Sequence, residues 1–471
     1  MRDFLWGDYR CKKRVFSLRV TSDGGGGGVY VYQNSTFTFY SGTISGNTSN
    51  NHGVGIFVND GPITMTGGTI GGDTTGDKNT ASSNGGGVYF TGTGKTFTMN
   101  DGDISGNRAS LGGGVCIIRN NSFIMKNGTI SNNETSAGFH GGGVYVSGEF
   151  IMEDGTISGN TAAASGGGVC VYGIFTMKDG KIINNTANCK YMNSNVGGGG
   201  VALYHTTSEP TSTSGQFIMQ GGVVSGNTSQ AYGGGIYAYS QTEFTMTGGT
   251  ISGNKSTDKD KGVGAYIYNK FNISGGAKFD ESNDVYLDGW SNKINITDTL
   301  SESKVATITP SAYTAGRQVL SAASGTITQD ICGKFALTPA PDGTDWTIVS
   351  NDDGTAGVIA LRTYTFKVEA DGTEIVEDST LSSVATITLS EVSRDGVALT
   401  ASDGTFLIEM QDTSGISFSS AGIADASATG LPATIKMPPL PPVPTPLQVY
   451  VKVVLTSGKV IDKTIPIMVM P

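Results

Sequence analysis

Residues Gly141–Asn160 read GGGVYVSGEFIMEDGTISGN, the clearest copy of a motif that recurs between Gly26 and Asn283. Related copies begin at Gly26 (GGGVYV), Gly85 (GGGVYF), Gly112 (GGGVCI), Gly166 (GGGVCV), Gly198 (GGGVAL) and Gly233 (GGGIYA), with degenerate copies at Gly53 (GVGIFV) and Gly262 (GVGAYI). Each copy holds three short β-type segments separated by glycine-containing turns. The shortest period, from Val144 to Val169, is 25 residues and leaves no room for a crossover helix. The sequence therefore predicts a chain that coils as strands alone.

Apolar residues fall into columns when the copies are aligned. The first position after the glycines is Val29, Ile56, Val88, Val115, Val144, Val169, Val201, Ile236 and Ala265. The second segment repeats a Phe-x-Met pattern, and the third supplies Ile44, Ile104, Ile130, Ile157, Ile182 and Ile251. Period-two alternation sends these columns to one side of each strand. We predict an all-β fold, a right-handed three-sheet parallel β-helix of about nine coils whose strands pair with their copies one coil away.

An asparagine stands three residues after each of these isoleucines. The set is Asn47, Asn107, Asn133, Asn160, Asn185 and Asn254. Amide side chains stacked at the coil spacing can hydrogen-bond as a ladder, so we interpret them as structural.

The rest of the chain divides by composition. Residues 1–23 lack the apolar run of a signal peptide and the repeat begins abruptly, so we expect an irregular leader or truncation remnant of an incomplete chain. The β-helix is expected over 24–296 and an irregular β cap over 297–362. Alternating runs such as TYTFKVE and LQVYVKVVL predict an immunoglobulin-like β-sandwich over 363–471, with PPLPPVPTP (Pro438–Pro446) as extended polyproline.

The amino-acid composition restricts the kinds of binding partner that we expect for the chain. The chain has 471 residues, 71 of them glycine, with 15% charged residues and a formal net charge of -10. This acidity argues against nucleic-acid and anionic-membrane partners. No stretch is long enough to span a bilayer, so we expect no membrane insertion. We expect the rod to be monomeric. The five cysteines form no C-x-x-C pair, and Cys116 and Cys170 are expected to be free thiols two coils apart.

The GGGV and ISGN motifs resemble the β-helical passenger repeats of bacterial adhesin-like surface proteins, including the polymorphic outer-membrane protein group. That group carries GGA-[ILV] and F-x-x-N, where this chain has GGG and I-S-G-N. The resemblance covers more than half of the chain. It implies an extracellular or cell-surface, non-enzymatic adhesin-like rod that binds host or cell-surface glycans or proteins.

Parallel β-helices also carry polysaccharide lyases and glycoside hydrolases, which is the alternative function. Such an enzyme needs convergent carboxylates on one outer face. The only acidic stack in adjacent coils is Asp154 with Asp179, and other copies place Asn or Gly in that slot, so a turn role is favoured. His52, His140 and His205 fall in loops without triad partners. Asp258 and Asp260 (DKDKG) begin a calcium-like loop that lacks its final glutamate, so no cofactor or metal is predicted.

Tyrosines occupy the positions that alternate away from the aliphatic columns. The candidate ligand-binding residues are Tyr172, Tyr204, Tyr237, Tyr239, Tyr266 and Tyr268, which we expect to be exposed. Exposed aromatic faces with hydroxyl groups suit stacking on sugar rings or packing against a protein. The alternative is that stacked tyrosines only reinforce a parallel sheet, where β propensity favours them.

Overall fold

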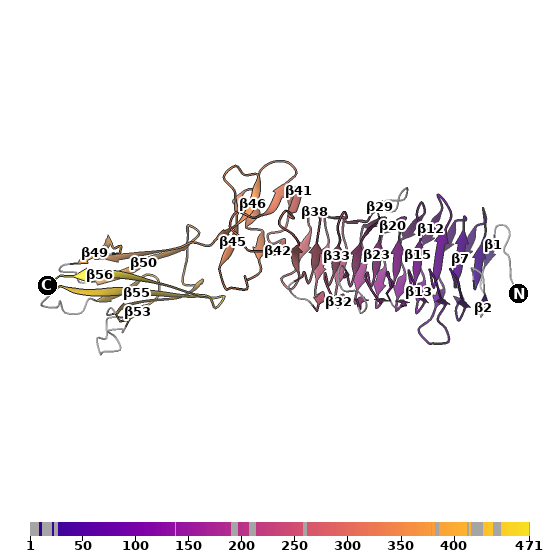
Figure 1. Ribbon diagram of the computed structural model, residues 1–471, viewed down its shortest axis with the longest axis horizontal. Coiled ribbons are helices and arrows are strands. Elements are labelled where there is room, and N and C mark those ends of the chain that lie inside the picture. Colours follow the sequence, from indigo (N-terminus) through magenta and orange to yellow (C-terminus); the bar gives the residue numbers. More distant parts are fainter. Residues whose placement is uncertain are drawn as a thin grey trace. The chain divides into compact units, whose positions relative to one another are not determined.

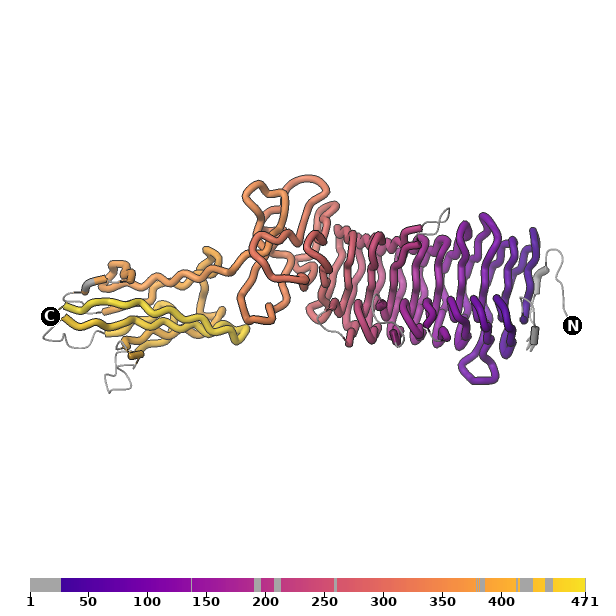
Figure 2. Tube along the Cα trace, in the orientation of Figure 1, coloured from indigo at the N-terminus to yellow at the C-terminus, as the bar shows by residue number. Residues whose placement is uncertain are grey.

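The computed structural model describes residues 9–11, 21–22, 27–136, 138–189, 196–206, 213–257, 261–377, 379–381, 386–411, 414–415, 427–436 and 444–470. The chain forms two compact units, Met1–Ala360 and Leu361–Pro471. The first unit is a parallel β-solenoid of about 11 coils, in which successive turns stack one on another (Figures 1 and 2).

Two long sheets run along the solenoid. Sheet A contains, in spatial order, β3 (Val29–Val31), β7 (Ile56–Asn59), β11 (Val88–Thr91), β15 (Val115–Ile117), β19 (Val144–Val146), β23 (Val169–Val171), β27 (Val201–Leu203), β33 (Ile236–Ala238), β37 (Ala265–Ile267), β40 (Asp284–Leu287), β42 (Ala306–Pro310) and β44 (Phe335–Leu337). Sheet B contains β1 (Tyr9–Cys11), β4 (Phe37–Phe39), β8 (Ile63–Met65), β12 (Thr96–Met99), β16 (Ser122–Met125), β20 (Glu149–Met152), β24 (Ile174–Met177), β30 (Gln216–Met219), β34 (Glu243–Met246), β38 (Lys270–Gly275), β41 (Ile294–Leu300), β43 (Gln318–Ala322), β46 (Ala356–Leu361) and β45 (Trp346–Ser350).

Two shorter sheets complete each coil. Sheet D, built on the isoleucine segments, contains β5 (Thr43–Ile44), β9 (Thr69–Gly71), β13 (Asp103–Ser105), β17 (Thr129–Ser131), β21 (Thr156–Ser158), β25 (Lys181–Ile183), β31 (Val223–Ser225), β35 (Thr250–Ser252) and β39 (Lys278–Phe279). Sheet C contains the two-residue strands β2 (Thr21–Ser22), β6 (Thr48–Ser49), β10 (Thr80–Ala81), β14 (Arg108–Ala109), β18 (Glu134–Thr135), β22 (Thr161–Ala162), β26 (Thr186–Ala187), β32 (Thr228–Ser229) and β36 (Lys255–Ser256). Sheet C directly follows the asparagine column and adds a fourth parallel sheet to the predicted three.

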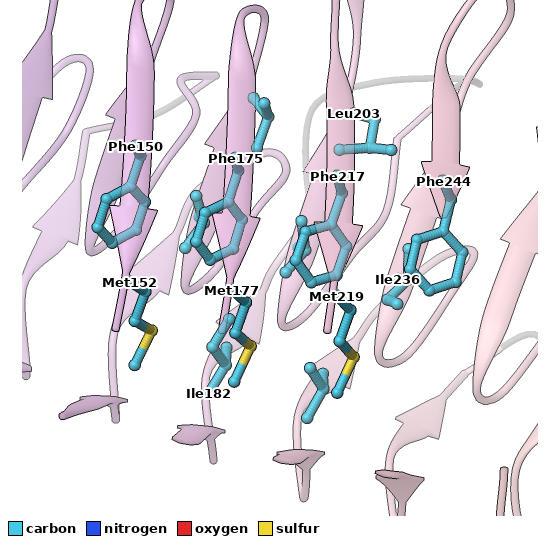
Figure 3. Packing of buried hydrophobic residues seen from close by; sticks show 14 of the residues in the cluster. Phe150, Met152, Phe175, Met177, Ile182, Leu203, Phe217, Met219, Ile236 and Phe244 are labelled. Carbon is cyan, nitrogen blue, oxygen red and sulfur yellow. The ribbon is translucent and has the colours of Figure 1, made fainter. Parts of the chain in front are cut away.

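The register confirms the aligned columns. Phe150 pairs with Phe175 and Met152 with Met177 across β20 and β24. The phenylalanine rings stack at 4.6 Å between centroids with an interplanar angle of 6°. Figure 3 shows these Phe and Met side chains repeating from coil to coil inside the solenoid. All four side chains are fully buried, so the repeat supplies one continuous apolar core.

The parallel stacking continues past the predicted nine coils. β42 pairs in parallel with β40, and β44 pairs with β42, within the segment expected to be an irregular cap. The motif is no longer recognisable there, but apolar residues such as Val305 and Ile308 still face the core. The solenoid then closes with β46, which pairs antiparallel to β43, and with the short helix α1 (Gln329–Cys332).

The asparagine column forms the predicted ladder. Its members are Asn47, Asn79, Asn107, Asn133, Asn160, Asn185, Asn227, Asn254 and Asn283, each at most 3% exposed. Each of these side chains up to Asn254 donates from Nδ2 to Oδ1 of the next asparagine. Asn79 and Asn283 were outside the predicted column because the spacing is altered around them, and Asn227 was outside it because valine replaces the isoleucine in its V-S-G-N copy. The ladder satisfies polar groups that the turn would otherwise leave buried without partners.

The second unit holds two sheets around a separate apolar core. One contains β48 (Thr373–Glu374), β47 (Tyr364–Ala370), β50 (Thr386–Arg394), β51 (Val397–Ala398) and β54 (Ala433–Lys436). The other contains β49 (Ser379–Leu381), β56 (Val460–Val469), β55 (Thr445–Leu455), β52 (Gly404–Gln411) and β53 (Ser427–Thr429). Pairing is antiparallel except between β49 and β56. Residues of both sheets, among them Ile387 and Val451, share one core. Most of the predicted polyproline run lies outside the described residues.

Candidate functional site

The outer face of sheet A carries a second apolar cluster, separate from the solenoid core. Its buried members are Cys170, Ala202, Tyr204, Tyr237, Tyr266 and Tyr286, and Tyr145, Tyr172, Tyr232 and Tyr239 pack against them partly buried. The residues between them along each strand, such as Val171 and Ile236, belong to the core. The tyrosines therefore point away from the core, as the alternation predicts.

The expected exposure is wrong for Tyr204, Tyr237 and Tyr266. Their exposed fractions are 8%, 0% and 6%. The small side chains of Cys170 and Ala202 occupy neighbouring outward positions, and the Tyr204 ring packs in the same cluster. The Tyr204 hydroxyl donates to Oγ of Ser165 at 2.8 Å, so this tyrosine is held as part of a packed layer.

A ring contact and a hydrogen bond of Tyr266 also stabilise this layer of tyrosines. Tyr232, which lies in the turn before β33, stacks on Tyr266 with 5.0 Å between ring centroids. The Tyr266 hydroxyl donates to Asp288 Oδ2 at 2.6 Å. The Tyr237 hydroxyl is buried without a hydrogen-bond partner in the described part of the chain. Burial makes these tyrosines packing residues in the structure.

Exposed aromatic surface remains at the end of the same face. Tyr268 is 43% exposed, and its ring lies 5.7 Å from that of the partly buried Tyr239. Trp290, which follows β40, is 61% exposed. The loop that carries Trp290 is joined to Tyr268 by Asn292, which donates to the Tyr268 backbone oxygen. We name Tyr239, Tyr268 and Trp290 the aromatic platform. Trp290 was not among the predicted site residues, because it lies in an irregular loop rather than in a repeat column.

Hydrogen bonds from Asn292 and Arg317 stabilise the loops that carry the aromatic platform. Asn292 donates from Nδ2 to the backbone oxygen of Tyr268 at 2.6 Å. Arg317, only 1% exposed, donates from Nη2 to the backbone oxygens of Leu287 and Gly289 at 3.2 and 2.9 Å. Its guanidinium carbon lies 5.8 Å from the centroid of the Trp290 ring. These bonds hold the Trp290 loop in place, so ligand binding there would require little ordering.

A groove of about 780 Å³ lies over the last coils of sheet A. Its floor contains Asp284, Tyr286, Thr307 and Thr309, which alternate with core residues of β40 and β42 and pair in register. Lys261 contributes to one wall, where its Nζ donates to the Tyr286 hydroxyl at 2.8 Å. The Tyr313 hydroxyl donates to the backbone oxygen of Thr338 at 2.8 Å, which ties another wall to the next coil.

Three carboxylates line this groove, and each already holds a local bond. Asp284 Oδ1 accepts from the Val263 amide at 2.6 Å, and Oδ2 accepts from the Thr309 hydroxyl. Burial raises the pKa of Asp284. Glu281 forms an ion pair with Lys304 at 3.4 Å, and Asp342 accepts from the Thr344 amide at 2.9 Å. Each of the three carboxylates therefore has a structural partner in the fold.

The other acidic candidates hold turns. Asp154 Oδ1 accepts from the Gly155 amide at 2.6 Å, and Asp179 Oδ1 accepts from the Gly180 amide at 2.7 Å. Both glycines have positive φ, 102° and 97°, as the predicted turn requires. The predicted turn role of these aspartates is confirmed.

Each of the three histidine rings lies close to a tyrosine ring on the outer face of sheet A. His52 stacks on Tyr89 at 4.7 Å, His140 lies 5.4 Å from Tyr204, and His205 lies 6.0 Å from Tyr239. Burial lowers the pKa of His140 to about 4, so this imidazole is neutral near pH 7. Its Nδ1 has no hydrogen-bond partner in the described residues.

The candidate metal ligands and the buried cysteines form no reactive group among the described residues. Among the described residues, no group of three His, Cys, Asp or Glu side chains could hold a metal ion. The calcium-like Asp258 and Asp260 lie outside the described residues. Cys116 and Cys170 are free thiols, as predicted. Both are fully buried, and burial raises the pKa of both thiols, which keeps them protonated.

No protein-family model matches the chain, and no curated protein matches its sequence. No helix in the described residues has the length and apolar character needed to cross a membrane. The fold defines the chain as a parallel β-solenoid repeat protein with a second, mainly antiparallel β unit.

Proposed function

We propose that this chain is a non-enzymatic, adhesin-like binding rod that acts outside the cell or at its surface, and that it binds glycans or proteins through the aromatic platform. The observation that carries the proposal is the exposure of Tyr268 and Trp290, at 43% and 61%, on braced loops next to a layer whose other tyrosines are buried. Large exposed aromatic faces held in place are typical of recognition surfaces.

Two further points support a binding role over catalysis. The repeats resemble adhesin passenger repeats, which supports the surface location. The carboxylates that line the groove each have a backbone, hydroxyl or lysine partner, which favours a structural role for them over catalysis.

The test compares wild-type protein with Tyr268→Ser and Trp290→Ser on arrays of glycans and extracellular-matrix proteins. We expect each substitution to weaken binding to the wild-type target about tenfold or more. Tyr32→Ser is the matched control, because Tyr32 occupies the same repeat position in the first coil and is 37% exposed. Wild-type binding by both platform variants would contradict the proposal, as would release of sugar products from a bound polysaccharide.

A further inference from the structure

The groove over β40 and β42 differs in character from the aromatic platform. Its volume of about 780 Å³ lies in the range of small-molecule binding clefts, roughly 300–1,000 Å³. Pro310, Pro339 and Pro341 stand along it, and its floor is a hydrogen-bonded parallel sheet. Such walls lose little conformational entropy when a ligand binds. The groove is therefore a preformed site.

The polar groups left available in the groove are hydroxyls. Thr307 and Ser311 line it, and neither hydroxyl makes a hydrogen bond within the described residues. A hydroxyl both donates and accepts, which matches the hydroxyl groups of a sugar. The Lys261 ammonium uses one N–H on the Tyr286 hydroxyl and has further donors to offer.

The charges of the groove select against acidic ligands, and its carboxylates already have partners. Glu281, Asp284 and Asp342 face a single lining ammonium, Lys261, so an acidic ligand meets an excess of negative charge. For a cationic ligand, both oxygens of the buried Asp284 already accept one hydrogen bond each, and Glu281 is already paired with Lys304. A neutral ligand rich in hydroxyl groups fits both conditions.

We propose that this groove is a second binding site, which takes a neutral oligosaccharide. The site is independent of Tyr268 and Trp290, which do not line it. Thr307 and Ser311 contact the sugar hydroxyls, and Lys261 donates to a sugar oxygen at the wall.

Isothermal titration of the full chain tests the proposal with three kinds of probe: neutral gluco-, manno- and galacto-oligosaccharides, oligogalacturonate, and a lysine-rich peptide. We expect a neutral oligosaccharide to bind best. Thr307→Phe fills the floor and Ser311→Trp fills the exposed edge, and each should weaken that binding about tenfold or more. Thr98→Phe is the matched control, since Thr98 is an outward-facing, half-buried threonine of β12 in sheet B.

Three results would overturn the site: no binding of any neutral oligosaccharide, tighter binding of oligogalacturonate or the peptide, or wild-type affinity in both groove variants. Thermal unfolding shows whether Thr307→Phe folds, and the exposed Ser311→Trp keeps the test decisive if it does not. Tyr268→Ser should leave the titration unchanged. A failure of the platform proposal would therefore appear in Tyr268→Ser and Trp290→Ser. A failure of the groove proposal would appear in Thr307→Phe and Ser311→Trp.

Discussion

Asn160 and Asn185, one coil apart, are joined twice: Oδ1 of Asn185 accepts from the backbone amide of Asn160 at 3.0 Å and from its side-chain Nδ2 at 2.9 Å. Asn160 Nδ2 also donates to the backbone oxygen of Ile130 at 2.9 Å, and Asn160 Oδ1 accepts both donors of Asn133. A single amide thus satisfies buried groups on three coils.

Asn160→Ala should destabilise the solenoid by about 3 kcal/mol or more, because several buried donors and acceptors lose their partners together. Chemical unfolding followed by circular dichroism measures the loss. Asn127→Ala, at an exposed turn, is the control and should change stability by less than about 0.5 kcal/mol. Equal effects of the two substitutions would show that the ladder contributes nothing.

Ile157→Asp should destabilise the protein by more than about 4 kcal/mol. Ile157 is fully buried between Ile130 and Ile182, so the substitution places an unpaired charge in the core. Hydrogen exchange should show the coils around β21 opening first. Ser158→Asp, on the outward side of the same strand, should be tolerated, and an unchanged unfolding midpoint for Ile157→Asp would exclude the assigned register.

Tyr237→Phe should leave stability unchanged or raise it by about 1 kcal/mol, because the buried Tyr237 hydroxyl has no partner among the described residues. Tyr204→Phe is its counterpart and should cost about 1 kcal/mol, since it removes the bond to Ser165. Paired thermal unfolding curves measure both. A large loss of stability in Tyr237→Phe would mean that the Tyr237 hydroxyl makes a stabilising hydrogen bond.

Stability should fall as the pH is lowered from about 6.5 to about 4, partly through His140. The pKa of His140 is about 4 in the folded protein and 6.5 for the ordinary side chain, so in this window only the unfolded chain takes up the proton. The full effect is roughly 3 kcal/mol, reached near pH 4. His140→Phe keeps an aromatic ring against Tyr204 and removes this titration.

Urea unfolding of both proteins at pH 7.5 and 4.5 measures that difference. The variant should lose less stability than the wild type on acidification. Asp284, whose pKa is raised, acts in the opposite direction, but it is present in both proteins and cancels in the comparison. Parallel losses in the two proteins would show that His140 is not buried as a neutral group.

The repeat pattern predicted the core residues that recur in every coil. The short strands of sheet C and the burial of the outer tyrosines depend on contacts that the pattern does not contain. Columns such as Phe150 and Phe175 were predictable because every coil supplies the same residue to the same neighbour. The strands of sheet C were not, since two residues such as Thr161–Ala162 show no alternation. The burial of Tyr204 depends on Cys170 in the preceding coil and on Tyr237 in the next coil, which the pattern of a single strand does not show.

The candidate site was less predictable than the core. Tyr268 was a sequence prediction, whereas Trp290 and the groove depend on Arg317 and on coils whose motif has dissolved. These coils keep apolar residues such as Ile308 in the core but vary in length, so their outer residues could not be aligned with the repeat.

In-register stacking of adjacent coils underlies the ladder, the aromatic layer and the groove, and a pair of engineered cysteines tests it directly. Glu149 and Ile174 are paired on the outer side of β20 and β24, so their Cα atoms lie about 4.8 Å apart, within reach of a disulfide. The variant Glu149→Cys with Ile174→Cys should form this disulfide under mild oxidation, as detected by mass spectrometry of the digested protein. The pair Glu149→Cys with Thr176→Cys, on the same face but two residues out of register, should keep free thiols. Cross-linking of the second pair, or free thiols in the first, would contradict the account.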